Sequence, residues 1–376
     1  MRSRASWRSE TTQRDRSRPN PFRAPFHWDI APDGSRLELA AGDGLAAVTL
    51  PARPTLLTGG VAHGARATID AIVGRAAVEH WAIARVAARP GHRLRPAVAA
   101  GLDHAVETIA RDADGNGDVT AARMRTIVEA FRNSAEPDDL TYAQVLGALA
   151  AAAADARWGI MLAVDDVHAA HRRESESLLG AAAAVTAYNT SFRSIVSATH
   201  RSCVATERAT RDTWVEVPLT LTTNALTGVL EGVAARHDRC FAPDAVAALF
   251  RASDGAPDFA VDQAALAWTS TRDPVISAAC VAAAAEPADA ARTARLRATW
   301  SSQLSLGQRR YLRAVAEHGE RGAEVEIVAR DLGGVTRFGL SPSMLDGLLT
   351  LLVQRGLLVV HEGMARIAVP GLSRIL

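Results

Sequence analysis

The chain has 376 residues, of which 48% are hydrophobic, and this is enough apolar material for two or three domains. Its 42 basic residues are all arginine and balance 41 acidic ones, so the net charge of +1 excludes a strong overall attraction to nucleic acid or membranes. The three cysteines, Cys203, Cys240 and Cys280, form neither a CxxC pair nor a disulfide framework. We therefore expect a cytoplasmic protein without redox or zinc chemistry.

The first nineteen residues are polar and rich in arginine and serine, without the apolar core of a signal peptide. We expect residues 1–19 to be a disordered basic tail. Farther along, the alanine-rich run 147–158 is interrupted by Asp155 and Arg157, and no run reaches the roughly 18 apolar residues of a membrane span. We therefore expect no membrane partner.

A phosphate-loop frame follows a short apolar run. Residues 54–66 read PTLLTGGVAHGAR, which predicts a strand, a glycine loop and a helix that begins near Ala65. A phosphate loop binds phosphates with backbone N–H groups, while its Lys neutralises the β- and γ-phosphates and its Ser or Thr holds Mg²⁺. Ala65 and Arg66 stand at those two positions. The candidate nucleotide-binding residues are Gly59, Gly60, Gly64, Ala65 and Arg66.

Two further apolar runs predict strands of the same sheet. Residues 159–164 end in Asp165 and Asp166, and residues 192–199 follow another helical stretch. Because strands that alternate with helices build parallel sheets, the pattern indicates an α/β domain with both carboxylates at the ligand-binding edge. Residues 219–268 then have a helical pattern, with breaks at 240–243 and 253–257.

The last part of the chain predicts a winged helix. Helices are expected at 305–318 and 324–332 and after Ser341-Pro342, followed by strands at 356–360 and 365–369. The candidate recognition helix, Ser341 to Arg355, has fewer positive charges than a groove-reading helix usually carries. Because winged helices also bind proteins, DNA and protein partners both remain open.

Residues 112–120 match the first nine positions of an EF-hand calcium loop. The candidate ligands are Asp112, Asp114, Asn116 and Asp118. The twelfth position is Arg123, which places a cation where the site needs a bidentate carboxylate. The alternative is a turn that caps the next helix, and we do not expect calcium as a cofactor.

The order of these parts resembles that of bacterial AAA-type ATP-binding proteins related to origin-recognition ATPases. The resemblance is carried by NPF at 20–22, LLTGGVAHGA at 56–65, GIMLAVDDVH at 159–168, DGAPDFAVDQAALAW at 254–268 and LSLGQRRYLRAVAEHG at 304–319. It implies a three-layer α/β P-loop NTPase domain of the AAA type at 20–215. A helical lid at 216–290 and a winged helix at 300–376 would follow.

The resemblance also implies roles for single residues. Asp165 would hold Mg²⁺ through water, and Asp166 stands where the family has a Glu that polarises the attacking water, so these two are the catalytic candidates. Ser197 or Thr199 would read the γ-phosphate. In the lid, Asp258 stands where a relative often has an Arg, and an acidic group there repels a triphosphate.

Three functions follow from this pattern. The preferred one is a degenerate AAA-type protein that binds nucleotide weakly or not at all and serves as a scaffold or regulator of a protein partner. The second is a slow ATPase that uses ATP and Mg²⁺ at Asp165 and Asp166, with Arg66 in place of the Lys. The third is a DNA-binding regulator that acts through the winged helix. A homo- or hetero-oligomer is compatible with all three.

Overall fold

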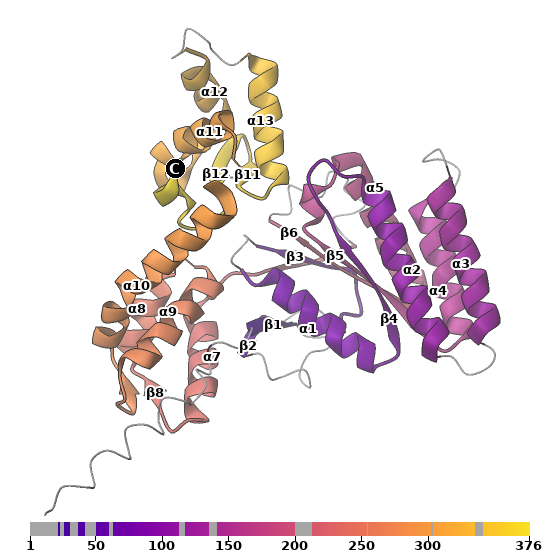
Figure 1. Cartoon of the computed structure of the whole chain (residues 1–376), viewed down its shortest axis with the longest axis horizontal. Coiled ribbons are helices and arrows are strands. Elements are labelled where there is room, and N and C mark those ends of the chain that lie inside the picture. Colours follow the sequence, from indigo (N-terminus) through magenta and orange to yellow (C-terminus); the bar gives the residue numbers. More distant parts are fainter. Residues whose placement is uncertain are drawn as a thin grey trace, which may run out of the picture.

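A five-stranded parallel sheet with helices on both faces forms the centre of the molecule (Figure 1). The computed structural model describes residues 22, 26–30, 37–41, 50–59, 63–112, 117–134, 141–199, 213–253, 255–301, 304–334 and 341–376. The strand order is β4-β5-β6-β3-β7. The strands are β3 (Thr55–Thr58), β4 (Trp81–Ala87), β5 (Gly159–Asp165), β6 (Phe192–Ala198) and β7 (Val215–Pro218).

The sheet separates two apolar cores, because successive side chains of a strand point to opposite faces. In β5, Leu162 and Val164 enter one core, and Met161 and Ala163 enter the other. The first core is covered by α2 (Leu94–Asp112), α3 (Gly117–Asn133), α4 (Tyr142–Asp155) and α5 (Arg172–Tyr188). The second contains α1 (Ala65–Val78) and the lid. The predicted three-layer α/β P-loop fold is confirmed.

The segment predicted to be a lid, which keeps that name below, consists of helices joined by short connections. They are α7 (Thr223–Ala235), α8 (Pro243–Ala252), α9 (Pro257–Ser270) and α10 (Ala278–Leu296), and the short strands β8 (Cys240–Phe241) and β9 (Val275–Ile276) pair in parallel. Pro243 and Pro257 each occupy the first turn of a helix, where a missing N–H costs no hydrogen bond. The expected boundary after residue 215 lies inside β7, which pairs with β3 up to Pro218.

The C-terminal unit has its own apolar core, which includes Tyr311, Leu312 and Leu352. Its elements are α11 (Leu306–Glu317), β10 (Ala323–Glu324), α12 (Val325–Gly334), α13 (Pro342–Gln354), β11 (Leu358–His361) and β12 (Met364–Ile367). The strands form an antiparallel sheet in the order β10-β12-β11. Ser305 and Ser341 cap α11 and α13 by accepting hydrogen bonds from backbone N–H groups.

Two other features lie outside this plan. An antiparallel pair, β1 (Phe26–Ile30) and β2 (Leu37–Ala41), precedes the main sheet.

Within the described ranges, none of the helices is both long and apolar enough to cross a bilayer.

Candidate functional site

One cavity of about 450 Å³ lies at the carboxyl ends of β3, β5 and β6. It gathers residues that are far apart in the sequence and were predicted to act together: Gly59, Gly64, Ala65, Arg66, Asp165 and Asp166. Ser197, Thr199 and Asp258 also line the cavity, as do Ala67, Asp70 and Ala198. Gly60 lies outside the described residues. Ligands of open α/β sheets bind in this position because the strand ends and the helix N-termini meet there.

The glycine frame positions the start of α1. Gly64 has a φ of 75°, in the left-handed region that favours glycine, and α1 begins at the next residue. Gly59 N–H donates to the carbonyl of Ala198 at 3.0 Å, which joins the loop to β6. The Thr68 hydroxyl, one turn into α1, donates to the carbonyl of Gly64 at 2.8 Å and is therefore used inside the helix.

Asp165 forms an ion pair with an arginine that the sequence analysis overlooked. Arg85, on the neighbouring strand β4, places Nε 3.0 Å and Nη2 2.6 Å from Oδ2 of Asp165. Its Nη2 also lies 2.8 Å from Oδ1 of Asp70 on α1. Burial raises the pKa of the Asp165 carboxyl, and the Arg85 guanidinium opposes this shift. The carboxylate at the magnesium position is thus held by a cation of the protein itself.

The residues present do not fit Mg²⁺. Oδ1 of Asp165 is buried and has no hydrogen-bond partner in the described structure, and this atom favours a cation. The hydroxyl that would complete a magnesium site is replaced by the exposed side chain of Arg66.

Asp166 is turned by a strained backbone. Its φ of 53° lies in the left-handed region, and its N–H donates to the Ser197 hydroxyl at 2.9 Å. Ser197 therefore anchors the turn after β5. Partial removal from solvent in the cavity raises the pKa of the Asp166 carboxyl, and Arg66 opposes the shift. Asp166 thus faces a cation where a catalytic base would face water.

Asp258 supplies a further acidic group from the first turn of α9. Burial raises the pKa of its carboxyl to about 7; Asp262 adds to the shift and Arg295 opposes it. Four carboxyl groups therefore line the cavity with one guanidinium, that of Arg66, and Arg85 pairs with two of the four, Asp70 and Asp165. A nucleotide triphosphate would meet a net negative site, which disfavours binding.

The C-terminal unit contacts this end of the sheet through Gly356. The 3₁₀ turn η3 (Val167–Ala169) contains the buried His168, whose pKa is lowered to about 4 by burial. A Cβ on Gly356 would lie 2.8 Å from Nε2 of His168 and 2.9 Å from Cγ2 of Thr199. The φ of Gly356 is 68°. Only glycine permits both this conformation and this approach.

The calcium candidates are only partly placed. Helix α2 ends at Asp112 and α3 begins at Gly117, in agreement with a turn between two helices. Asp114 and Asn116 lie outside the described residues, as do the side chains of Asp112 and Asp118. The calcium interpretation therefore stays a prediction.

Comparison with solved structures shows the fold. No protein-family model and no curated protein sequence matches this chain. The Walker-type ATPase PABY2304 of Pyrococcus abyssi aligns with a TM-score of 0.51 and 15% identity over 85% of this chain and 90% of its own. The Aeropyrum pernix ORC2 protein in ADPNP–ADP complexes aligns at 0.44 and 14% identity, over 87% of each chain. The first similarity, together with the sheet order, shows that this chain has the α/β fold of the P-loop ATPases.

Proposed function

We propose that this protein is a degenerate P-loop ATPase, which retains the fold and the cavity but works as a scaffold or regulator instead of hydrolysing ATP. The observation that carries the proposal is the Arg85–Asp165 ion pair at 2.6 Å. A magnesium ion held by Asp165 would have to share the carboxylate with the Arg85 guanidinium, and the repulsion between two cations on one carboxylate disfavours this arrangement.

The loop supports the same proposal. Phosphoryl transfer depends on positioned positive charge, and Ala65 offers none where the loop lysine would stand. Arg66 is exposed and electrostatically coupled to Asp166. In the slow-ATPase alternative, Arg66 would have to leave Asp166 for the phosphates, and the raised pKa values of Asp165 and Asp166 would weaken them as magnesium ligands.

We assign the scaffold role to the C-terminal unit as a winged helix. The order α11, β10, α12, α13, β11, β12 is that of a winged helix-turn-helix. On α13 the exposed side chains include Ser343, Met344, Asp346 and Thr350, and none of these four is a cation. Met344 is 56% exposed. An apolar and acidic helix face suits a protein partner better than the phosphates of DNA.

Thermal unfolding with and without 1 mM Mg-ATP tests the proposal. A ligand at one hundred times its Kd stabilises a protein by about 2.7 kcal/mol, so micromolar binding would raise the melting temperature by several degrees. We expect no rise for the wild type. A magnesium-dependent rise that is lost in Arg66→Gln would support the slow ATPase instead. A salt-sensitive gel shift with duplex DNA would support the DNA-binding alternative.

A further inference from the structure

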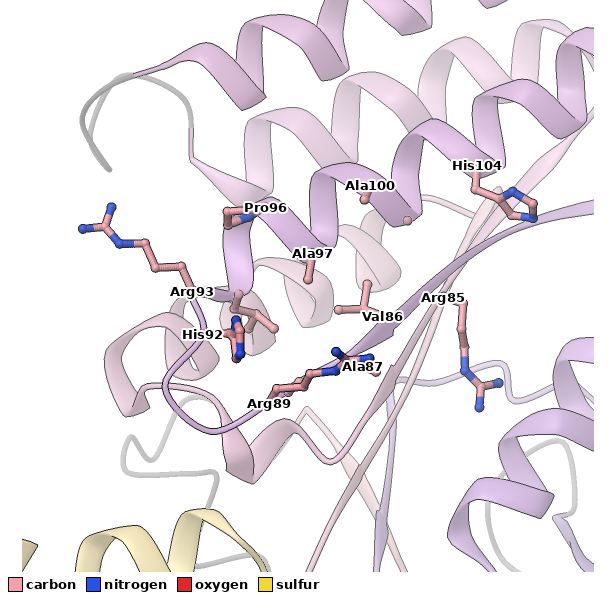
Figure 2. Close-up of a pocket in the computed structure, with 13 residues that line it drawn as sticks. Arg85, Val86, Ala87, Arg89, His92, Arg93, Pro96, Ala97, Ala100 and His104 are labelled. Carbon is pink, nitrogen blue, oxygen red and sulfur yellow. The ribbon is translucent and has the colours of Figure 1, made fainter. Parts of the chain in front are cut away.

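A second cavity, of about 500 Å³, lies between the end of β4 and helix α2 (Figure 2). Its floor is apolar and is formed by Val86 of β4 and by Ala97 and Ala100 of α2. The two alanines leave open space that larger side chains would fill. At Gly101 the helix packs closely on the strand, because a Cβ there would lie only 2.8 Å from the carbonyl oxygen of Arg85. The volume is in the usual range for small-molecule sites.

Backbone groups of β4 face this cavity. β4 is an edge strand, and in a parallel ladder alternate residues direct N–H and C=O away from the partner strand. Ala88 N–H donates to Asp165, and the carbonyl of His80 accepts from Gly159, so the even-numbered residues of β4 pair with β5. Ala87 therefore turns its N–H to the open edge, where it lines the cavity. This N–H is available to an acceptor on a ligand.

The titratable side chains that line the cavity are all basic among the residues described: Arg85, Arg89, His92, Arg93 and His104. The guanidinium of Arg85 extends to the other side of β4, where it meets Asp70 and Asp165 (Figure 2). Within the described structure Arg89 and Arg93 have no ion pair. The chain as a whole has a net charge of only +1, so this excess of positive charge is local.

The loop between β4 and α2 fixes these basic groups. Gly91 has a φ of 76°, and His92 N–H donates to the carbonyl of Arg89 at 3.1 Å. This turn places Arg89 and His92 beside the end of β4 and sends Arg93 outward from the start of α2 (Figure 2). The first N–H of α2, that of Leu94, is already bound to Glu174 at 2.5 Å. The site therefore depends on the arginines and on Ala87 more than on the helix end.

We propose that this cavity binds a small phosphate-bearing ligand. Arg89 holds the phosphate together with the N–H of Ala87, because guanidinium forks match phosphate oxygens, and Arg93 adds positive charge at the rim of the cavity. The remainder of the ligand packs on Val86, Ala97 and Ala100. The cavity volume limits the ligand to the size of a small molecule. This site lies on the opposite side of β4 from the Arg85–Asp165 pair and does not depend on the function proposed above.

Isothermal titration without magnesium tests the proposal, with pyrophosphate and AMP as probes. We expect one saturable site for at least one probe, with affinity at least tenfold lower in Arg89→Gln and a smaller loss in Arg93→Gln. Arg330→Gln, which removes an exposed charge from α12, should bind as the wild type does. Arg66→Gln should also bind normally, because Arg66 belongs to the other cavity. Tighter binding of AMP that is lost in Ala100→Leu would place the organic part of the ligand on the apolar floor.

Three outcomes would overturn the proposal. The first is the absence of saturable binding of either probe at millimolar concentration. The second is binding that is lost in Arg66→Gln and kept in Arg89→Gln, which would place the phosphate in the glycine loop. The third is tighter binding of a single-stranded oligonucleotide with the same dependence on Arg89, which would identify a nucleic-acid surface. Because both arginines are exposed, unchanged melting temperatures of the variants verify that they fold.

Discussion

At the scale of single residues, Arg85 determines the character of the candidate site. It contacts carboxylates on two different elements, Asp70 on α1 and Asp165 on β5. Asp165 is only 9% exposed, whereas Asp70 is exposed, so the loss of the contact with Asp165 would lower the stability of the protein more than the loss of the contact with Asp70. The ion pair with Asp165 satisfies a charge that would otherwise be buried alone.

Replacing Arg85 tests this role. Arg85→Met leaves the Asp165 carboxylate without a cation, and we expect the free energy of unfolding at pH 7 to fall by about 3 kcal/mol. The loss should shrink below about pH 4, where the carboxyl is protonated in both states. Urea denaturation measures it. The control is Arg75→Met, which removes a more exposed pair with Glu79 and should cost under about 1 kcal/mol. Equal losses in both variants would contradict the account.

Asp258 gives the stability of the protein a pH dependence. Its pKa is about 7 in the folded state against 3.8 for a free carboxyl, so between these values the folded state keeps a proton that the unfolded state releases. Stability therefore falls as pH rises from about 4 to about 7. Asp258→Asn removes this loss of stability. We expect the free energy of unfolding of the variant to be roughly 3 kcal/mol above that of wild type at pH 8 and equal to it at pH 3.

Urea denaturation at several pH values measures this difference. Asp244→Asn, which replaces an exposed carboxylate in the first turn of α8, is the control and should show no comparable gain at pH 8. An Asp258→Asn variant whose stability follows that of wild type across the pH range would show that the lid does not bury this group.

At the scale of elements, the contact between the loop after α13 and η3 joins the C-terminal unit to the sheet. Gly356→Ala destabilises the folded protein in two ways. It forces an alanine into a left-handed backbone conformation, and it places a Cβ within 3 Å of His168 and Thr199. Gly363 has a φ of 77°, and a Cβ added there would meet no atom within 4 Å, so Gly363→Ala carries only the backbone cost. The pair of variants separates strain from contact.

We expect Gly356→Ala to loosen the contact. Hydrogen exchange of residues 167–169 should become faster in Gly356→Ala and stay unchanged in Gly363→Ala, because only the first substitution displaces His168. Equal exchange in both variants would show that α13 does not hold η3 in place.

The predicted strand β5 and the overlooked strand β4 differ in how deeply their residues are buried. Every residue of β5 is buried, so it appears as a continuous apolar run that ends in two aspartates. β4 is an edge strand in which buried residues alternate with partly exposed ones, and Arg85 occupies one of the latter positions. An arginine there is typical of a surface, and its partner lies 80 residues away. Its role becomes evident only when β4 and β5 are paired.

At the scale of the whole molecule, two cores share one sheet and a third core belongs to the C-terminal unit. Several elements were predictable from local patterns, such as the apolar run of β5 and the capped starts of α11 and α13, whereas β4 and β7 were not predicted. The contact of Gly356 with His168 was not predictable either, since it joins two loops that are distant in the sequence and depends on the packing of separate units. Much of the fold thus follows from local patterns, whereas the chemistry of the cavity follows from long-range pairs.

Equilibrium dialysis of labelled ATP against the full chain, with and without Mg²⁺, tests the central claim most directly. The ion pair between Arg85 and Asp165, the missing loop lysine and the acidic lining predict no saturable binding below millimolar ATP and no effect of Mg²⁺. Saturable binding at micromolar ATP that requires Mg²⁺ would contradict the claim, because it would show that the site holds a magnesium-nucleotide complex despite the Arg85–Asp165 pair.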